Sequence, residues 1–374
     1  MKKVIESIVP REANGRVRGR LLLGIFPGEG IGPEVLRAAL EVLDAVESAA
    51  GVKVERVAIP EGPFRFDGSG FQNLPDEVAS FCHEIFERGG ALLCGPGGGR
   101  FVYEMRRQFD LFCKVAPIRP VAALAQSARL KPHVVQHADM LVVRDNAGGV
   151  YQGQWEDRVD PIGGRVAEHR FSYCQHQVER IVGVGLRLAA TRRRRMHVIV
   201  KDGGVPSISN LWRDVTMRLG AGSGVECCMM NADYAAYQMI QHPGEFDVIV
   251  TPNMVGDILA DLGAVFLGSR GMSYSANFAA DGRAVYQTGH GGAKDLANTD
   301  RANPLAQIFS LAMLLRESFG MDEEASLVES AIDRVLADGW RTDDLAEAGC
   351  RCIGTREMGA LVAQSVVAGV KVSA

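Results

Sequence analysis

The chain has 374 residues, of which 47% are hydrophobic and 23% are charged, so it can bury a large core and we expect two domains. Its formal net charge of −4 excludes the global basic surface typical of nucleic-acid-binding proteins, and we expect no nucleic-acid partner. It has no run of 18 or more apolar residues and no zinc-type pairing among its eight cysteines, so we expect a cytoplasmic protein with reduced thiols and no membrane partner.

Along the chain, short apolar runs alternate with helical patterns. Leu21–Phe26 predicts a buried strand, Pro27–Ile31 a glycine-rich turn, and Pro33–Ser48 a helix with proline in its first turn. Further strands are predicted at Ala91–Cys94, Met140–Val143, His197–Val200 and Asp247–Val250. The glycine-rich stretches Cys94–Gly99 and His290–Ala293 each follow a predicted strand, as loops near ligands often do. This order predicts an α/β protein with a substantially parallel sheet.

Two carboxylates, Asp257 and Asp261, lie four residues apart in a segment that predicts a helix, so they share one helical face. Like charges at this spacing repel each other unless a cation lies between them, and Mg²⁺ and Mn²⁺ prefer carboxylate oxygens. The pair is therefore a candidate metal site, and the alternative is an ordinary solvated helix face.

Six segments, taken in order, resemble the isocitrate and 3-isopropylmalate dehydrogenases, which are metal-dependent β-decarboxylating dehydrogenases. The opening turn, Gly28–Gly32, is not the G-x-G-x-x-G fingerprint of dinucleotide-binding folds. It resembles instead the GDGIGPE opening of this family. The matching segments are Phe26–Glu34, Met105–Phe112, Val143–Gly153, Asp233–Gln238, Val255–Asp261, and Gly289–Ala297 with Ala302–Pro304.

The resemblance implies that a 2-hydroxy acid with a 3-carboxylate is oxidised, loses CO₂ and is reprotonated. It assigns Mg²⁺ or Mn²⁺ to Asp233, Asp257 and Asp261, because a divalent cation would stabilise the charge that develops on the 2-oxygen. It assigns proton transfer to Tyr151 and Lys201. Outside the family context, these two residues would be interpreted as a core tyrosine and a solvated lysine.

Substrate carboxylates require cations, and Arg106 and Arg144 occupy family arginine positions. A third family arginine is replaced by Ala116. Lys114 or Arg119 could supply the replacement charge, and we leave both open.

The position that selects the 3-substituent carries Arg100, where isocitrate dehydrogenases place a serine and isopropylmalate enzymes apolar side chains. Arg100 indicates an anionic substituent, as in isocitrate, homoisocitrate or a phosphonomethylmalate. The alternative is an arginine turned to solvent.

Asp295 occupies the position at which NAD-dependent relatives bind the adenosine ribose, and its charge would repel the 2'-phosphate of NADP. We therefore expect NAD as the cofactor. The cofactor-binding residues expected from the resemblance are His290, Gly291, Gly292, Ala293, Asp295 and Asn303.

The implied fold is a two-domain, isopropylmalate-dehydrogenase-like α/β fold with a mixed, largely parallel sheet and helices on both faces. Residues 1–110 and 268–374 would form the cofactor domain, and 111–267 the dimerisation and substrate domain. The resemblance implies a homodimer in which Lys201 and Asp233 serve the partner's site. We expect NAD-dependent oxidative decarboxylation of a 3-substituted malate (EC 1.1.1.-). The alternatives are a dehydrogenase of 3-isopropylmalate, malate or tartrate, and a non-catalytic regulatory relative.

Overall fold

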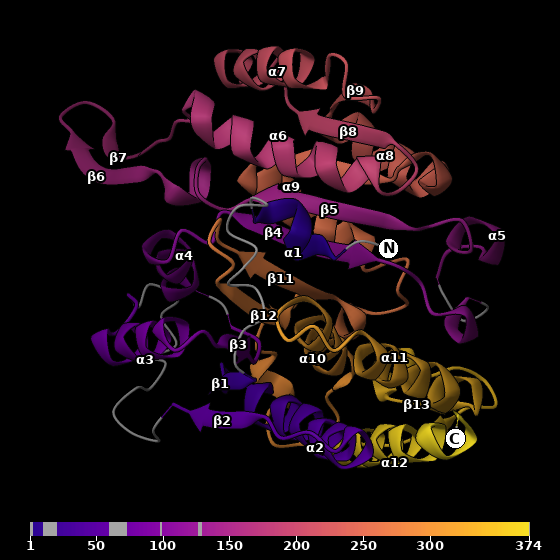
Figure 1. The fold of residues 1–374 in the computed structure, drawn as a ribbon. Coiled ribbons are helices and arrows are strands. Elements are labelled where there is room, and N and C mark those ends of the chain that lie inside the picture. Colours follow the sequence, from indigo (N-terminus) through magenta and orange to yellow (C-terminus); the bar gives the residue numbers. More distant parts are fainter. Residues whose placement is uncertain (1–2, 10–20, 60–72, 98, 126–128, 374) are drawn as a thin grey trace.

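A computed structural model describes residues 3–9, 21–59, 73–97, 99–125 and 129–373. It confirms an α/β fold with helices on both faces of a large mixed sheet (Figure 1). The expected glycine-rich stretch before Arg100 includes Gly98, which lies outside the described residues.

The main sheet has the strand order β2-β1-β3-β12-β11-β4-β5-β10-β8-β9. The antiparallel pairings β12–β11, β11–β4 and β4–β5 lie in its middle, and the pairings on both sides are parallel. The strands of this sheet are β1 Leu22–Phe26, β2 Glu55–Ala58, β3 Ala91–Cys94, β4 Cys113–Ile118, β5 Met140–Asp145, β8 Arg195–Val200, β9 Glu226–Asn231, β10 Val248–Thr251, β11 Tyr274–Phe278 and β12 Ala284–Thr288. Strands β1, β3, β5 and β10 are buried along their whole length, as expected for strands covered on both faces.

Two short sheets stand apart from the main sheet. Strands β6 (Gln154–Asp160) and β7 (Gly164–Arg170) form an antiparallel hairpin that projects from the body of the molecule (Figure 1). Strands β13 (Trp340–Arg341) and β14 (Arg351–Cys352) pair in parallel.

The helices form two main groups. Helices α2, α10, α11 and α12 pack against one another, with α10 lying on β11 and β12, whereas α6, α7 and α8 gather near β8 and β9 (Figure 1). The helices are α1 Val4–Ile8, α2 Gly32–Ala50, α3 Asp76–Glu87, α4 Arg100–Gln108, α5 Pro132–Val135, α6 Gln175–Ala190, α7 Pro206–Gly220, α8 Ala232–Gln241, α9 Asn253–Gly263, α10 Leu305–Glu317, α11 Asp322–Ala337 and α12 Thr355–Ser373. Short 3₁₀ turns connect them at η2 Ala122–Leu124, η3 Val150–Gln152, η4 Pro243–Glu245, η5 Arg270–Met272, η6 Lys294–Leu296 and η7 Asp343–Leu345.

The strands and helices predicted from the sequence are present, with ends shifted by at most two residues. The helix expected from Pro33 begins at Gly32, and the two carboxylates Asp257 and Asp261 lie on α9 as predicted. The glycine-rich loop at His290 follows β12. All eight cysteines are free thiols, and no helix within the described residues is long and apolar enough to cross a membrane.

The strand order gathers β1–β3, β11 and β12 at one side of the sheet and β4, β5 and β8–β10 at the other. The first group comes from the two segments expected to form the cofactor domain, and the second from residues 111–267. Because the sheet is continuous through the β11–β4 pairing, the division into two domains stays a prediction.

Candidate active site

Asp257 and Asp261 project from α9, which follows the buried strand β10. The Asp257 carboxylate forms an ion pair with Arg144, and the Asp261 carboxylate lies 2.8 Å from the guanidinium of Arg270. The side chains of Asp257 and Asp261 are 40% and 48% exposed, so both carboxylates can be reached by a cation from solvent.

Three basic residues surround Asp257 on neighbouring elements. Arg106 lies on α4, Lys114 on β4 and Arg144 on β5, and all three are buried. Lys114 and Arg144 are paired across the antiparallel β4–β5 ladder, so their side chains leave the same face of the sheet. Asn253 accepts hydrogen bonds from the Arg144 guanidinium at 2.8 and 3.0 Å, which fixes its orientation.

The electrostatics of this cluster favour an anion. Burial lowers the pKa of Lys114 well below its ordinary value, and the charges of Arg106 and Arg144 lower it further. Burial, followed by the charge of Arg144, also lowers the pKa of Arg106 to about 10. Although burial alone would raise the pKa of Asp257, Arg144 and Lys114 hold it below its usual value. Since three buried basic groups outnumber the carboxylates of Asp257 and Asp261 that act on them, the cluster has capacity for a further anionic group.

The structure distinguishes between Lys114 and Arg119, the two residues considered as replacements for the missing family arginine. Lys114 lies in the cation cluster, on the same strand face as Ala116, because side chains two residues apart on a strand point to the same side. Arg119 is exposed beyond the end of β4, where its charge acts on Tyr274 and Asp333. Lys114, and not Arg119, is therefore placed beside Arg106 and Arg144.

Tyr151 lies on η3, beside the cation cluster. Its phenol bonds with the Asp257 carboxylate, and its ring lies 5.6 Å from the Arg144 guanidinium. Burial, followed by the charge of Asp257 and this hydrogen bond, raises the pKa of Tyr151. The phenol is therefore protonated at neutral pH and can act as a proton donor.

Arg100 holds Tyr151 in place from the neighbouring helix α4. It donates a hydrogen bond of 2.7 Å to the carbonyl oxygen of Tyr151, and its guanidinium lies 4.6 Å from the ring centre of Trp155. On the same helix, the Tyr103 carbonyl accepts a hydrogen bond from Gln152. Arg100 thus uses part of its guanidinium to bind other residues of the protein. The sequence had suggested either a contact with an anionic substituent or an arginine turned to solvent, and neither includes these contacts.

Lys201 and Asp233 form a separate pair. The Lys201 ammonium follows β8 and lies 2.7 Å from the Asp233 carboxylate at the start of α8. The hydrogen bond from Lys201 is the main cause of the lowered pKa of Asp233. Among the described residues, no group of three His, Cys, Asp or Glu side chains could hold a metal ion within one chain. Within this part of the chain, Asp257 and Asp261 are therefore not joined by a third side chain of these types.

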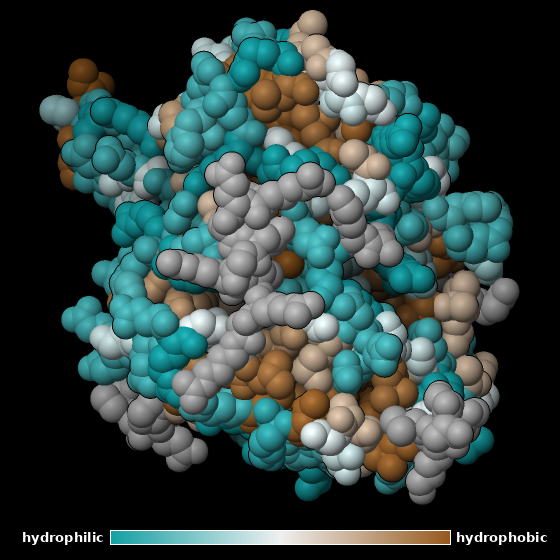
Figure 2. All heavy atoms as spheres, in the orientation of Figure 1, coloured by the Kyte–Doolittle hydropathy of each residue, from teal (hydrophilic) through white to brown (hydrophobic). Residues whose placement is uncertain are grey.

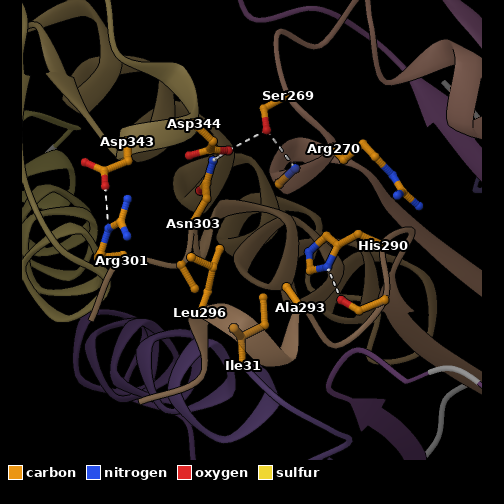
Figure 3. A pocket seen from close by; sticks show the side chains of 13 residues that line it. Ile31, Ser269, Arg270, His290, Ala293, Leu296, Arg301, Asn303, Asp343 and Asp344 are labelled. Atoms are coloured by element: carbon orange, nitrogen blue, oxygen red, sulfur yellow. Dashed lines mark hydrogen bonds and ion pairs between the residues drawn. The ribbon is translucent and has the colours of Figure 1, made fainter. Parts of the chain in front are cut away.

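A cavity of about 530 Å³ lies between the opening turn, the His290 loop and η7 (Figure 3). His290, Gly291, Ala293 and Asn303, four of the six residues predicted to bind the cofactor, line it, and their binding of a cofactor stays a prediction. Gly292 lies between the lining residues Gly291 and Ala293 but does not line the cavity itself. Its carbonyl accepts a hydrogen bond from Ile31, and a Cβ added at Gly30 would lie 1.8 Å from that oxygen.

The residues of this cavity fit a dinucleotide. Ile31, Ala293, Leu296 and Ala302 give it an apolar wall suited to a flat base. The Nε2 atom of His290 is buried and has no hydrogen-bond partner within the described residues, which is a common sign of a missing ligand.

Asp295, the predicted cofactor-selecting residue, lies on η6 and is exposed. It is not among the residues that line the cavity, and its neighbour Lys294 lies 3.5 Å from Glu29. Asp295 would therefore contact the cofactor only where the bound cofactor extends beyond the cavity.

Four charged cavity residues were not foreseen from the sequence: Arg270, Arg301, Asp343 and Asp344. They lie in three segments that are separated by 30 or more residues, and none belongs to a motif with a recognisable spacing. Only the resemblance around Ala302–Pro304 could have directed attention to Arg301.

Comparisons with known proteins agree with this arrangement. The sequence model of the isocitrate/isopropylmalate dehydrogenase family matches residues 22–362. A 3-isopropylmalate dehydrogenase of Desulfitobacterium hafniense (strain Y51) is 36% identical over 352 residues, which cover 90% of this chain and 97% of that protein. One of Geobacillus kaustophilus (strain HTA426) is 37% identical, with 91% and 94% covered.

The fold is also found among solved structures. The crystal structure of isocitrate dehydrogenase from Methylococcus capsulatus has a TM-score of 0.80 and 27% sequence identity, and the match covers 92% of this chain and 99% of that one. The TT0538 protein from Thermus thermophilus has the same TM-score and identity, with 96% of this chain and 69% of that chain covered.

Proposed function

The chain belongs to the isocitrate/isopropylmalate dehydrogenase family of decarboxylating dehydrogenases, and we propose that it oxidises and decarboxylates a 3-substituted malate with NAD and Mg²⁺ or Mn²⁺. The observation that carries the proposal is the buried cluster of Arg106, Lys114 and Arg144 around Asp257 and Tyr151. The three buried basic groups outnumber the nearby carboxylates of Asp257 and Asp261, which favours the binding of a small polyanion. Tyr151 adds a proton donor to the same site.

The cation cluster would bind the carboxylates of the malate unit. Arg106 and Arg144 present guanidinium groups that can bind planar carboxylates in bidentate fashion, and Lys114 adds a point charge beside them. These contacts orient the substrate with its 2-hydroxyl toward α9. Burial strengthens each contact because little water screens it.

Asp257 and Asp261 would hold the divalent cation, whose chemistry is to stabilise negative charge on the 2-oxygen, and NAD would supply the hydride acceptor. Lys201 would take the proton of the 2-hydroxyl as the neutral amine, and its contact with the Asp233 carboxylate orients the Nζ atom. Tyr151 would deliver a proton to carbon after CO₂ has left, because its phenol remains protonated at neutral pH.

We further propose a homodimer in which Lys201 and Asp233 complete the partner's site. Within one chain they pair with each other and not with Asp257 and Asp261. The two helices of this region also expose large apolar side chains. These are Tyr234 and Tyr237 on α8, and Met254 and Ile258 on α9. Apolar side chains exposed together on adjacent helices are typical of a subunit interface.

The 3-substituent has two candidate chemistries. An anionic group would use the remaining donors of Arg100, since Nη1 bonds with the Tyr151 carbonyl and Nε is buried without a partner among the described residues. An apolar group is favoured by the adjoining buried Val102 and by the names of the relatives, which are 3-isopropylmalate dehydrogenases.

The test is an absorbance assay for NADH with the purified protein, NAD, Mn²⁺ and malates that carry alkyl, carboxylate, aryl or phosphonomethyl 3-substituents. We expect NADH formation with at least one of them and its loss when EDTA removes the metal. Turnover of apolar substrates alone would refute the anionic role of Arg100. Absence of NADH across the panel, with malate and tartrate included, would support a non-catalytic relative instead.

A further inference from the structure

The cavity of Figure 3 has two chemically different ends. At one end Arg270 pairs with Asp261, a proposed metal ligand, so this end adjoins the reaction site. At the opposite end Arg301 and Asp343 face each other, with 2.7 Å between Nε and Oδ2 (Figure 3). A dinucleotide whose reactive ring lies near Asp261 would place its adenosine at the Arg301–Asp343 end.

The two carboxylates at this adenosine end are not equivalent. Asp344 accepts hydrogen bonds from Ser269, Asn303 and Thr342, so it joins η7 to the neighbouring loops. A Cβ at Gly271 would lie 2.5 Å from its oxygen, so the loops are closely packed around it. Asp344 is therefore structural, whereas Asp343 is 48% exposed and pairs with Arg301.

The charge of the adenosine end disfavours a phosphate. Arg301 contributes one positive charge, and Asp343 and Asp344 contribute two negative charges. The Arg301 guanidinium is 59% exposed and carries donors suited to a phosphate, but Asp343 neutralises it. Asp295 lies outside the cavity lining, so within the cavity Asp343 is the carboxylate placed to oppose a 2'-phosphate.

We propose that Asp343 sets the coenzyme choice of this protein by masking Arg301, and that its removal uncovers a site for the 2'-phosphate of NADP. This inference rests on the proposed function, because it takes the cavity as the nicotinamide-coenzyme site. It assigns discrimination to an ion pair inside the cavity, in addition to the charge of Asp295 on η6.

The test measures the binding of NADH and NADPH to the purified protein by coenzyme fluorescence, without substrate. In Asp343→Asn we expect the ratio of NADPH to NADH affinity to rise about tenfold or more, the effect of one hydrogen bond between charged groups. The double variant Asp343→Asn/Arg301→Gln should lose that gain. Binding of 2',5'-ADP and 5'-AMP, which lack the nicotinamide half, should show the same pattern.

Asp281→Asn is the matched control, since Asp281 also pairs with an arginine, Arg283, but neither residue lines the cavity. An unchanged affinity ratio in Asp343→Asn, in a variant whose thermal unfolding matches wild type, would refute the proposal. So would a gain that persists in the double variant, or one that Asp281→Asn reproduces in full. Failure of the wild-type protein to bind either coenzyme would instead refute the proposed function itself.

Discussion

Lys114 is a buried lysine that lies near Arg106 and Arg144 on the face of the sheet that bears the candidate site. A buried cation beside like charges destabilises a folded protein, and the lowered pKa of Lys114 reflects that cost. Such a group is retained most readily where a ligand neutralises it. We therefore attribute the burial of Lys114 to the proposed substrate binding and not to stability.

We predict that Lys114→Met separates activity from stability. The variant should lose about 10-fold to 100-fold in kcat/KM, because one charge-assisted hydrogen bond to substrate is removed. Its free energy of unfolding should stay within about 1 kcal/mol of the wild-type value, since an apolar side chain of similar length replaces a lysine whose cost of burial Asp257 and Asp261 only partly offset. Steady-state kinetics and thermal unfolding of the ligand-free protein measure the two effects.

The exposed Lys131, at the start of α5, provides the control variant Lys131→Met, which should change neither quantity. Wild-type kcat/KM in Lys114→Met would show that the lysine does not bind substrate.

At the scale of elements, α9 packs closely on β5, and this contact holds Arg144 under the helix. Gly256 lies within α9, where alanine would ordinarily favour the helix. A Cβ at this position would lie 2.6 Å from Thr251 Oγ1 and 2.8 Å from Arg144 Cβ. Neither atom is the end of a flexible side chain, so the helix itself would have to shift.

We predict that Gly256→Ala destabilises the protein by about 1–3 kcal/mol and lowers kcat/KM, because overpacking displaces both α9 and Arg144. On α6, Gly183→Ala is the matched helical control. Its nearest neighbour would be the guanidinium tip of Arg187 at 3.2 Å, which can move. The control should keep wild-type activity and gain up to about 1 kcal/mol. Equal effects of the two substitutions in denaturant unfolding would contradict this account.

Helix α1 is attached to α10 through a titrating carboxyl group. Glu317 is buried at the end of α10 and accepts a hydrogen bond of 2.9 Å from the Ile5 amide. Burial raises the pKa of Glu317 from 4.5 to about 7. Between these values the folded state holds a proton that the unfolded state has released, so the free energy of unfolding falls as the pH rises through this window.

We predict that Glu317→Gln removes this pH dependence. At about pH 8 the variant should be more stable than wild type by up to about 3 kcal/mol, and near pH 4.5 the two should converge. Denaturant unfolding at several pH values gives the difference directly. A difference that does not vary with pH would show that Glu317 is ionised throughout in the folded protein.

At the scale of the whole molecule, the β6–β7 hairpin and helices α8 and α9 expose apolar side chains. Val159 and Ile162 on the hairpin are 80% and 99% exposed, and apolar atoms are visible at its tip (Figure 2). These features suit contact with a second copy of the chain, which would bring Lys201 and Asp233 to the partner's aspartates.

We predict that two inactive variants restore each other's activity. Tyr151→Phe and Lys201→Ala should each lose most activity, but mixed dimers obtained by coexpressing the two with different tags should show about half of the wild-type level, since one of their two sites is intact. Assays of the doubly purified mixed species provide the measurement. Mixed dimers without activity would show that Tyr151 and Lys201 do not serve one site across the interface.

Much of this protein could be predicted from its sequence, because the relevant signals are local. Apolar runs identified the buried strands, and the four-residue spacing placed Asp257 and Asp261 on one helical face. The ordered motifs identified the family and nominated the residues of the cation cluster.

Only the tertiary structure decided between residues whose local sequence gave no preference. Lys114 and Arg119 were equal candidates, and the β4–β5 pairing placed only Lys114 beside Arg144. Arg100 was found to bond with the Tyr151 carbonyl, and Asp343 was found beside Arg301, 42 residues away. Sequence patterns report which face of its own helix or strand a residue occupies. Which distant residue contacts that face depends on how the elements pack, and these contacts determine how the charges of the site are arranged.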